Sequence, residues 1–294
     1  MKKVVIIGAG ELGNAMNKIL SKNRNLVLES WNRKLGSSRG QKPIGDAAAE
    51  ADFVLLCVPS WAIREVAASV RNYLKKGAVI ITFAKGLEQK TKKTMDKVLG
   101  EELLKDQLYA LIGGPMIAEE IITGKIGIGF VAASEKKIFA KVKNLFEKSN
   151  IRIEYCADMR AVALCGVLKN IYAIGLGIID ALELGENFKG WVAQQAVCEM
   201  GQILEILGVE KNAIFSAGGF ADLMATGYSK NSRNRQVGDD LVKTGKCCLE
   251  SEGYISFSGV ASLLKNKIKK FPLFLSLHSV IEKGEDARRA FYDL

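Results

Sequence analysis

The chain is poor in the residues on which several common chemistries depend. It has a single histidine, His278, which lies in PLFLSLHSVIEKG without an evident partner. We therefore expect His278 on a helix surface, and a Ser-His-Asp triad has no support. The six cysteines include no C-x-x-C pair and no spacing typical of a metal site. The sequence indicates a cytoplasmic protein without disulfides and without a bound metal.

Long apolar runs and linkers are also scarce. Residues 161–182 are the most apolar stretch, but Lys169 and Asn170 interrupt it, so we expect no membrane span. The start, MKKVVIIGAG, is too short in apolar residues for a signal peptide and runs into glycines. No internal repeat or Pro/Gly-rich linker is evident. A length of 294 residues, 48% of them hydrophobic, suits one large or two ordinary globular domains.

Charge is unbalanced, with a formal net charge of +10. The basic residues are scattered, and neither an aromatic-interleaved basic motif nor a zinc signature accompanies them. We therefore expect a solvated basic surface and no nucleic-acid partner. Such a surface would attract a small anionic ligand.

The first residues carry the features of a dinucleotide-binding turn. KKVVIIGAGELGNAMNKIL predicts a β-branched strand, a glycine-rich turn and a helix. Gly8, Gly10 and Gly13 have the spacing G-x-G-x-x-G, which is informative here because a strand precedes it and a helix follows. The glycines allow a tight turn and close approach of the backbone to a pyrophosphate, and the helix offers free N–H groups.

Further strands are predicted at residues 25–31 and within ADFVLLCVPS, GAVIITFAKG, QLYALIGG, IGIGFVAAS and IRIEYCAD. Helical patterns separate the first four strands, so we expect these to form a parallel sheet covered on both faces, and the last two strands to close its edge. Ligands of such sheets lie beyond the carboxyl ends of the strands.

The end of the second strand lacks the acidic residue that binds the ribose hydroxyls of NAD. Glu29 falls within the strand, whose end reads Trp31-Asn32-Arg33-Lys34. Arg33 and Lys34, with Ser37 and Ser38 nearby, suit a 2′-phosphate and favour NADP over NAD. The alternative is that both cations are ordinary loop residues.

After about residue 157 the strand patterns stop and long helical patterns begin. We therefore expect an α/β Rossmann-type dinucleotide-binding domain at residues 1–157 and an all-α substrate domain at residues 158–294.

Lys169 is the most unusual residue of the second half. Between residues 161 and 182 the only charged side chains are Lys169 and Asp180. A helix that is apolar nearly all round is normally buried. Burial disfavours the charged form of lysine and makes it a proton donor or acceptor near neutral pH. The alternative is a lysine on a wet helix face or one whose head reaches water.

A second unusual segment is GGFADLMATGYSKNSRNRQVG. It contains the run Ser232-Arg233-Asn234-Arg235, whose arginine forks, serine and asparagine suit phosphate oxygens. An isolated lysine, Lys85, ends the fourth predicted strand. Each feature alone fits a solvated loop, but together with the Rossmann half and Lys169 they favour an enzyme.

These segments resemble the NAD(P)-dependent glycerol-3-phosphate dehydrogenases, whose helical domain is of the 6-phosphogluconate dehydrogenase C-terminal type. The resemblance runs through GAGELGNA, CVPSWAIREV, AKGLEQKT, GGPMIAEEI, GVLKNIYAIGLGIIDALELGENFKG, FADLMATGYSKNSRNRQVG and ESEGYISF. The lysine helix and the S-R-N-R run are its specific parts.

The resemblance implies a role for each matching position. Lys169 is the implied general acid/base, with Lys85 and Asp222 as further catalytic residues. The implied substrate positions are Lys85, Gly114, Asn170, Asp222, Thr226, Ser232, Arg233 and Asn234. The implied cofactor positions, beside Gly8, Gly10 and Gly13, are Glu11, Leu12, Arg33, Lys85, Ala118, Arg233 and Glu252. Members are commonly homodimers that use their helical domains.

Two positions depart from the family. Met116 replaces a hydroxyl residue after the Gly-Pro of the substrate loop, and the stretch between Arg33 and Ala51 is short. Both bear on the substrate more than on the reaction class.

The leading hypothesis is reversible hydride transfer between NAD(P)H and dihydroxyacetone phosphate, which gives sn-glycerol 3-phosphate. Asp222 would orient Lys169 or bind a substrate hydroxyl. The rivals are a related dehydrogenase for another small anion, such as a β-hydroxyacid, and a non-catalytic nucleotide sensor.

Overall fold

The computed structural model describes residues 1–33, 42–247, 249–292 and 294, which divide into two compact units. The first comprises residues 1–84 and 94–163, and the second comprises residues 85–93 and 164–294. The segment Lys85–Lys93, which follows the fourth strand, therefore packs with the helical half. The expected boundary near residue 157 lies shortly before this division, and the domain bounds stay a prediction.

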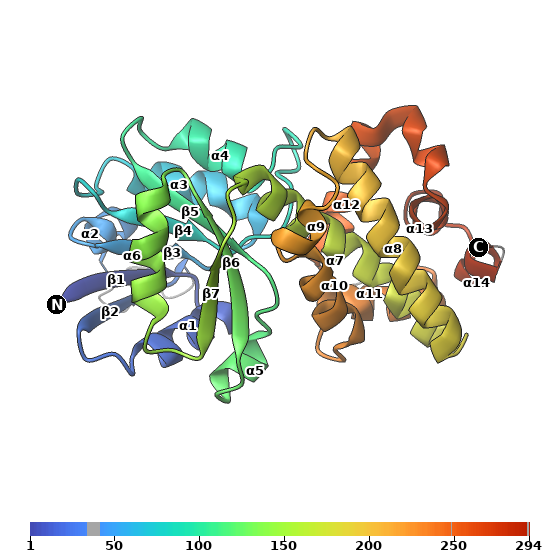
Figure 1. Cartoon of the computed structure of the whole chain (residues 1–294), viewed down its shortest axis with the longest axis horizontal. Helices are drawn as coiled ribbons and strands as arrows, with labels where there is room; N and C mark the ends of the chain where they lie inside the picture. The colour runs from blue at the N-terminus through green and yellow to red at the C-terminus, as the bar shows by residue number, and fades with distance from the viewer. Residues whose placement is uncertain (34–41, 248, 293) are drawn as a thin grey trace. The chain divides into compact units, whose positions relative to one another are not determined.

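A seven-stranded sheet forms the centre of the first unit, in the order β2-β1-β3-β4-β5-β6-β7 (Figure 1). The strands are β1 (Lys2–Ile7), β2 (Leu26–Trp31), β3 (Phe53–Leu56), β4 (Val79–Thr82), β5 (Leu108–Gly113), β6 (Gly127–Ala133) and β7 (Ile151–Tyr155). All residues of β3 and β4 are buried, as expected for strands that are covered on both faces.

The expected parallel pairing of the first four strands is confirmed, and the last two strands make the sheet mixed. β2 through β5 pair in parallel, but β6 pairs antiparallel with β5 and parallel with β7. The connection from β5 to β6 contains only the short helix α5 (Ala118–Ile122) and returns along β5. The predicted place of these two strands at the edge is confirmed.

The helices of this unit are α1 (Glu11–Leu20), α2 (Ile44–Ala48), α3 (Ile63–Val70), α4 (Met95–Glu102), α5 and α6 (Lys136–Phe146), with the 3-10 turn η3 (Ser60–Ala62). α1 packs on β1, β2 and α5, while α6 lies across β5, β6 and β7 (Figure 1). The buried faces of α1 and α6 supply apolar side chains to one core with the sheet.

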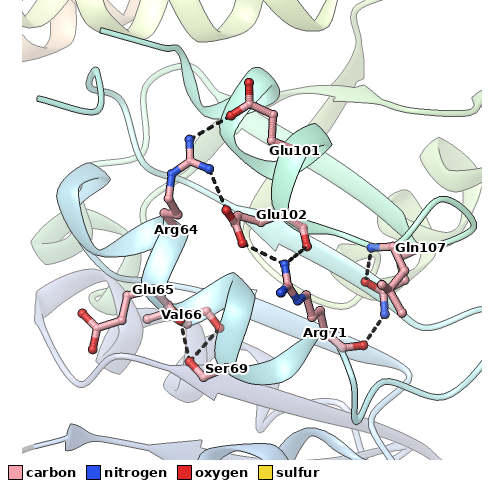
Figure 2. A network of polar contacts seen from close by, with 9 residues as sticks. Arg64, Glu65, Val66, Ser69, Arg71, Glu101, Glu102 and Gln107 are labelled. Carbon is pink, nitrogen blue, oxygen red and sulfur yellow. Dashed lines mark hydrogen bonds and ion pairs between the residues drawn. The ribbon is translucent and has the colours of Figure 1, made fainter. Parts of the chain in front are cut away.

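A polar network joins α3 to the end of α4 (Figure 2). The guanidinium of Arg64 lies 2.9 Å from Glu101 and 2.6 Å from Glu102. Arg71 reaches the other oxygen of Glu102 at 2.9 Å and also donates to its backbone carbonyl. Because one carboxylate receives two arginines, this network fixes the relative position of α3 and α4 better than isolated surface pairs would.

The second unit is helical. Its helices are α7 (Met159–Ala181, which the division cuts after Ala163), α8 (Glu186–Ile206), α9 (Ala213–Ser216), α10 (Gly219–Tyr228), α11 (Arg233–Thr244), α12 (Glu252–Leu264), α13 (Pro272–Lys283) and α14 (Ala287–Tyr292), with the 3-10 segment η4 (Lys265–Lys270). The expectation of a Rossmann-type unit followed by an all-α unit is confirmed.

The apolar helix α7 corrects one sequence expectation. By length and composition it is apolar enough to cross a membrane, so Lys169 and Asn170 do not disqualify it. Its apolar window is nevertheless wholly buried in the structure, as in the core helix of a folded domain.

Two other expectations concern side chains of the second unit and the cysteines. His278 on α13 is half-buried beside Phe257 rather than on an open surface, and its Nδ1 is buried. No disulfide joins the described cysteines, Cys57, Cys156, Cys165, Cys198 and Cys247. Cys248 lies outside the described residues.

Candidate active site

The glycine-rich turn after β1 has the geometry of a dinucleotide-binding turn. Gly8 has φ +112°, and a Cβ there would lie 2.3 Å from the carbonyl oxygen of Cys57. A Cβ at Gly13 would lie 1.9 Å from the carbonyl oxygen of Gly8, so α1 approaches the strand as only glycine permits. A Cβ at Gly10, the N-cap of α1, would meet nothing within 4 Å. This open cradle at a helix N-terminus fits a pyrophosphate.

The strand register brings the predicted cofactor residues to one edge. Ile7 of β1 pairs with Trp31 of β2 and with Leu56 of β3, so the carboxyl ends of these strands align. Arg33, just past β2, is exposed and lies 3.8 Å from Glu65, which is also exposed. A pair this open holds the arginine weakly. Lys34, Ser37 and Ser38 lie outside the described residues.

The remaining predicted residues of the first unit lie in the segments that follow β1 and β5. Glu11 and Leu12 form the first turn of α1, and Ala118 begins α5. Gly114 has φ +93°, and a Cβ there would lie 2.7 Å from a backbone oxygen, so this turn also requires glycine. Met116 is buried in the core of the unit, against Gly127 and Gly129.

In the second unit a buried cluster forms around Asp222. Lys169 Nζ lies 3.1 Å from Asp222 Oδ1, and Lys85 Nζ donates to Asp222 Oδ2 at 2.7 Å. Lys169 also donates to the hydroxyl of Thr226 at 2.8 Å, and that hydroxyl donates back to Asp222. Lys169, Asp222 and Thr226 are each less than 9% exposed. The sequence prediction that Lys169 is buried is confirmed.

The local sequence explains this arrangement. Asp222 and Thr226 are one turn apart on α10, so their side chains share a face. Gly166 lies one turn before Lys169, and a Cβ there would meet the stem of Lys85 at 3.1 Å. The glycine therefore lets Lys85 lie along α7 and reach the same carboxylate.

Burial and the neighbouring charges set the protonation of the cluster. Burial and, to a smaller extent, the positive charge of Lys85 lower the pKa of Lys169 to about 8, against the attraction of Asp222. Burial alone would raise the pKa of Asp222, but Lys169 and Lys85 outweigh it and hold that pKa below its usual value. A lysine with a pKa near 8 suits proton transfer at physiological pH.

A second set of contacts links the cluster to the S-R-N-R run. Asn170 donates to the backbone carbonyl of Lys85 at 2.9 Å and accepts from Asn234 at 2.8 Å. Asn234 in turn accepts from the backbone N–H of Gly253 at 2.9 Å. Asn170 and Asn234 are therefore buried in a chain of amide contacts that joins α7, α11 and α12.

Ser232 and Arg233 begin α11, where Ser232 is the N-cap and accepts from Arg235 N at 3.3 Å. Arg233 is exposed, whereas Arg235 is turned toward Asp180. From the sequence we expect both arginines to suit phosphate, but in the structure the guanidinium of Arg235 binds the carboxylate of Asp180. Glu252 lies in the first turn of α12, and its negative charge raises the pKa of Lys169 slightly.

A dinucleotide-binding sheet and a helical unit with a buried Lys-Asp-Lys cluster define a nicotinamide-dependent dehydrogenase. The chain matches two models of one family, the N-terminus of NAD-dependent glycerol-3-phosphate dehydrogenase over residues 39–140 and its C-terminus over residues 158–292. The chain belongs to this family.

Individual relatives agree over the full length. The glycerol-3-phosphate dehydrogenase [NAD(P)+] of Fusobacterium nucleatum is 30% identical over all of this chain and 96% of its own length. That of Clostridium acetobutylicum is 29% identical over all of this chain and 97% of its own length. The solved glycerol-3-phosphate dehydrogenase of Coxiella burnetii has the same fold, with a TM-score of 0.86, 23% identity and coverage of 99% of this chain and 98% of that one.

Proposed function

We propose that the chain catalyses the reaction of its family, the reversible reduction of dihydroxyacetone phosphate to sn-glycerol 3-phosphate with NADPH or NADH. The observation that carries the proposal is the buried cluster in which Lys169 and Lys85 share Asp222. Such a cluster supplies both a proton and a fixed positive charge, which carbonyl reduction requires.

The bound dinucleotide supplies the hydride in reduction and accepts it in oxidation. As hydride reaches the carbonyl carbon, negative charge develops on the oxygen, and the ammonium of Lys169 donates a proton to it. Lys85 stabilises the same developing charge, and Asp222 holds both ammonium groups in place. In the oxidation direction the neutral amine of Lys169 takes the proton back.

The N-terminus of α11 is our candidate for holding the phosphate of the substrate. Ser232, Arg233 and Asn234 combine a hydroxyl, a guanidinium and an amide at a helix N-terminus, where anions are favoured. Binding energy from this remote group would orient the carbonyl for reaction. Gly114, Asn170 and Thr226 are the further substrate positions that we propose.

We propose the turn of residues 8–13, with Arg33, Lys85, Ala118, Arg233 and Glu252, as the cofactor site. NADP is favoured over NAD because Arg33 stands where an NAD-binding acid would otherwise lie. We propose a cytoplasmic location, since the described cysteines form no disulfide, as in a reducing compartment.

We also propose a homodimer formed through the helical unit. Four large side chains on α8, α9 and α10, namely Trp191, Phe215, Phe220 and Tyr228, are 40–58% exposed. Phe215 and Phe220 lie side by side, with ring centres 5.7 Å apart, and exposed apolar groups gathered in this way typically mark an interface. Phe215→Glu should convert the dimer to a monomer in analytical ultracentrifugation. A wild-type chain that sediments as a monomer, or a Phe215→Glu variant that stays dimeric, would refute this interface.

The reaction is tested by following the oxidation of NADPH and NADH with dihydroxyacetone phosphate, and with an oxo-acid as the alternative substrate. We expect turnover with the phosphate and none with the oxo-acid. Turnover with the oxo-acid alone would favour the β-hydroxyacid alternative. Cofactor binding without any turnover across a panel of carbonyl compounds would favour the nucleotide sensor.

A further inference from the structure

A partly buried charge cluster lies at the end of α7, away from the proposed catalytic residues. Asp180 Oδ1 lies 2.7 Å from Lys189 Nζ, and Oδ2 lies 2.7 Å from both Nε and Nη2 of Arg235. Lys189 is only 6% exposed, and its ammonium lies 4.3 Å from the centre of the Tyr228 ring. One partly buried carboxylate thus balances two cations.

This cluster surrounds the turn that leads into α11. Tyr228 ends α10 and Ser232 caps α11, so both ends of the turn at residues 229–231 lie beside the cluster. Arg235 is bound to Asp180 through its side chain and to Ser232 through its backbone N–H. Asp180 is therefore connected, through one arginine, to the residue that begins the proposed phosphate site.

The same part of α11 lies unusually close to α7. A Cβ at Gly177 would lie 2.2 Å from the backbone oxygen of Arg235, and a Cβ at Gly238 would lie 2.3 Å from that of Ile174. Because α11 and α7 are packed this closely, any shift of the first turn of α11 changes the positions of Ser232, Arg233 and Asn234 relative to α7.

We propose that Asp180 is a positioning residue for the substrate phosphate. Through Arg235 it fixes the first turn of α11, so that Ser232, Arg233 and Asn234 are held in the arrangement that binds the anion. This inference rests on the proposed function, which assigns the phosphate to those three residues. Without the carboxylate, Lys189 and Arg235 repel each other and the first turn of α11 moves.

The effect falls on binding rather than on proton transfer. Asp180 follows Lys169 by eleven positions on α7, a distance of about 16 Å at 1.5 Å per residue. The contacts of Lys169 with Asp222 and Thr226 do not involve the Asp180 cluster. Variants of the cluster should therefore raise KM for the phosphorylated substrate and leave kcat nearly unchanged.

The test compares Asp180→Asn and Arg235→Lys with the wild type at saturating NADPH. Arg235→Lys keeps the positive charge but loses the paired N–H donors. This variant still tests the proposal if Asp180→Asn folds poorly. We expect KM for dihydroxyacetone phosphate to rise roughly tenfold in each variant, because a change of this size corresponds to the loss of one charge-assisted contact. The matched control is Asp239→Asn, which removes an exposed ion pair with Lys243 on the same helix and should leave KM unchanged.

A double variant tests whether the two residues act as one unit. If Asp180 acts through Arg235, KM of Asp180→Asn/Arg235→Lys should equal that of either single variant. If the two increases multiply, the residues act separately and the proposal is wrong. Unphosphorylated dihydroxyacetone should keep its kcat/KM in all variants, and an equal loss for both substrates would also overturn the proposal.

A binding measurement separates this inference from the proposed reaction. Calorimetric titration with inorganic phosphate needs no turnover, and both single variants should bind it about tenfold more weakly than the wild type. Unchanged phosphate affinity overturns the role of Asp180, whatever the substrate. If the wild-type enzyme binds phosphate but does not reduce dihydroxyacetone phosphate, the proposed reaction is refuted. The role of Asp180 is then still decided by comparing the phosphate affinities of the variants and the wild type.

Discussion

At the scale of single residues, Lys169 shows how a fold changes the chemistry of a side chain. An exposed lysine is almost fully charged at neutral pH and exchanges its proton too rarely to be a good acid/base. Burial in α7 lowers the pKa of Lys169 to about 8, while Asp222 and Thr226 keep its ammonium hydrogen-bonded. The group can therefore both donate and accept a proton near the working pH.

Lys169→Ala should lower kcat by roughly 100- to 10,000-fold, the usual contribution of a proton-transfer group. Cofactor affinity should hardly change. In the wild type, kcat for carbonyl reduction should fall as the pH rises through about 8, because the charged lysine is the donor. The oxidation rate should rise through the same pH, because the neutral amine is then the acceptor. Near-normal turnover of Lys169→Ala, or parallel pH profiles in both directions, would exclude this role.

Arg33 is the residue whose replacement tests cofactor preference. It pairs with an exposed glutamate, Glu65, 3.8 Å away, so its guanidinium can turn to a ligand at little cost. Arg33→Ala should lower the affinity for NADPH by roughly tenfold and leave the affinity for NADH unchanged, because one charge-assisted contact of about 1.4 kcal/mol with the 2′-phosphate is lost.

Titration of wild type and variant with both nucleotides measures this change. Arg24→Ala is a suitable control, because Arg24 is exposed just before the other end of the same strand. If Arg33→Ala lowers the affinities for NADH and NADPH equally, the arginine stacks on the adenine and does not bind the 2′-phosphate.

At the scale of elements, much of the fold could be predicted because its signals are local. The β-branched strand before Gly8, the G-x-G-x-x-G spacing and the apolar character of α7 each lie in one short segment. The contact of Asp180 with Arg235 spans 55 positions and leaves no local pattern. Lys189 likewise looks like any helix lysine until its burial is known. The direction of β6 and the packing of Lys85–Lys93 with the helical unit also depend on contacts distant in sequence.

The packing of α11 on α7 can be tested through Gly238. A Cβ at this position would lie 2.3 Å from the backbone oxygen of Ile174 and 2.6 Å from the backbone nitrogen of Ile178. Gly238→Ala should therefore destabilise the helical unit by about 1–3 kcal/mol, the usual cost of overpacking, despite the better helix propensity of alanine.

Thermal or denaturant unfolding measures this effect, with Gly190→Ala as the matched control. Gly190 lies within α8, and a Cβ there would meet nothing within 4 Å. That variant should gain roughly 0.5–1 kcal/mol from helix propensity. If both variants are stabilised, α11 does not pack on α7 as closely as the structure indicates.

At the scale of the whole molecule, the excess of basic residues becomes relevant to the substrate. The formal net charge is +10, yet the chain has no sequence feature of a nucleic-acid binder. A surface of one sign attracts small ligands of the opposite sign and raises the rate at which they arrive. Dihydroxyacetone phosphate is such an anion, so we expect the net charge to speed its arrival at the enzyme.

This role predicts a dependence on ionic strength. Raising the salt concentration from about 0.01 M to about 0.15 M shortens the Debye length from about 30 Å to about 8 Å. At saturating cofactor, kcat/KM for dihydroxyacetone phosphate should then fall by roughly tenfold, because screening weakens attraction between the basic surface and the anion. The value of kcat should change little, since the proposed catalytic groups Lys169 and Asp222 are buried. Neutral dihydroxyacetone provides the control, because its kcat/KM should hardly respond to salt. If salt reduces kcat/KM for both substrates equally, the loss reflects a change in the enzyme itself, and the net charge plays no part in substrate capture.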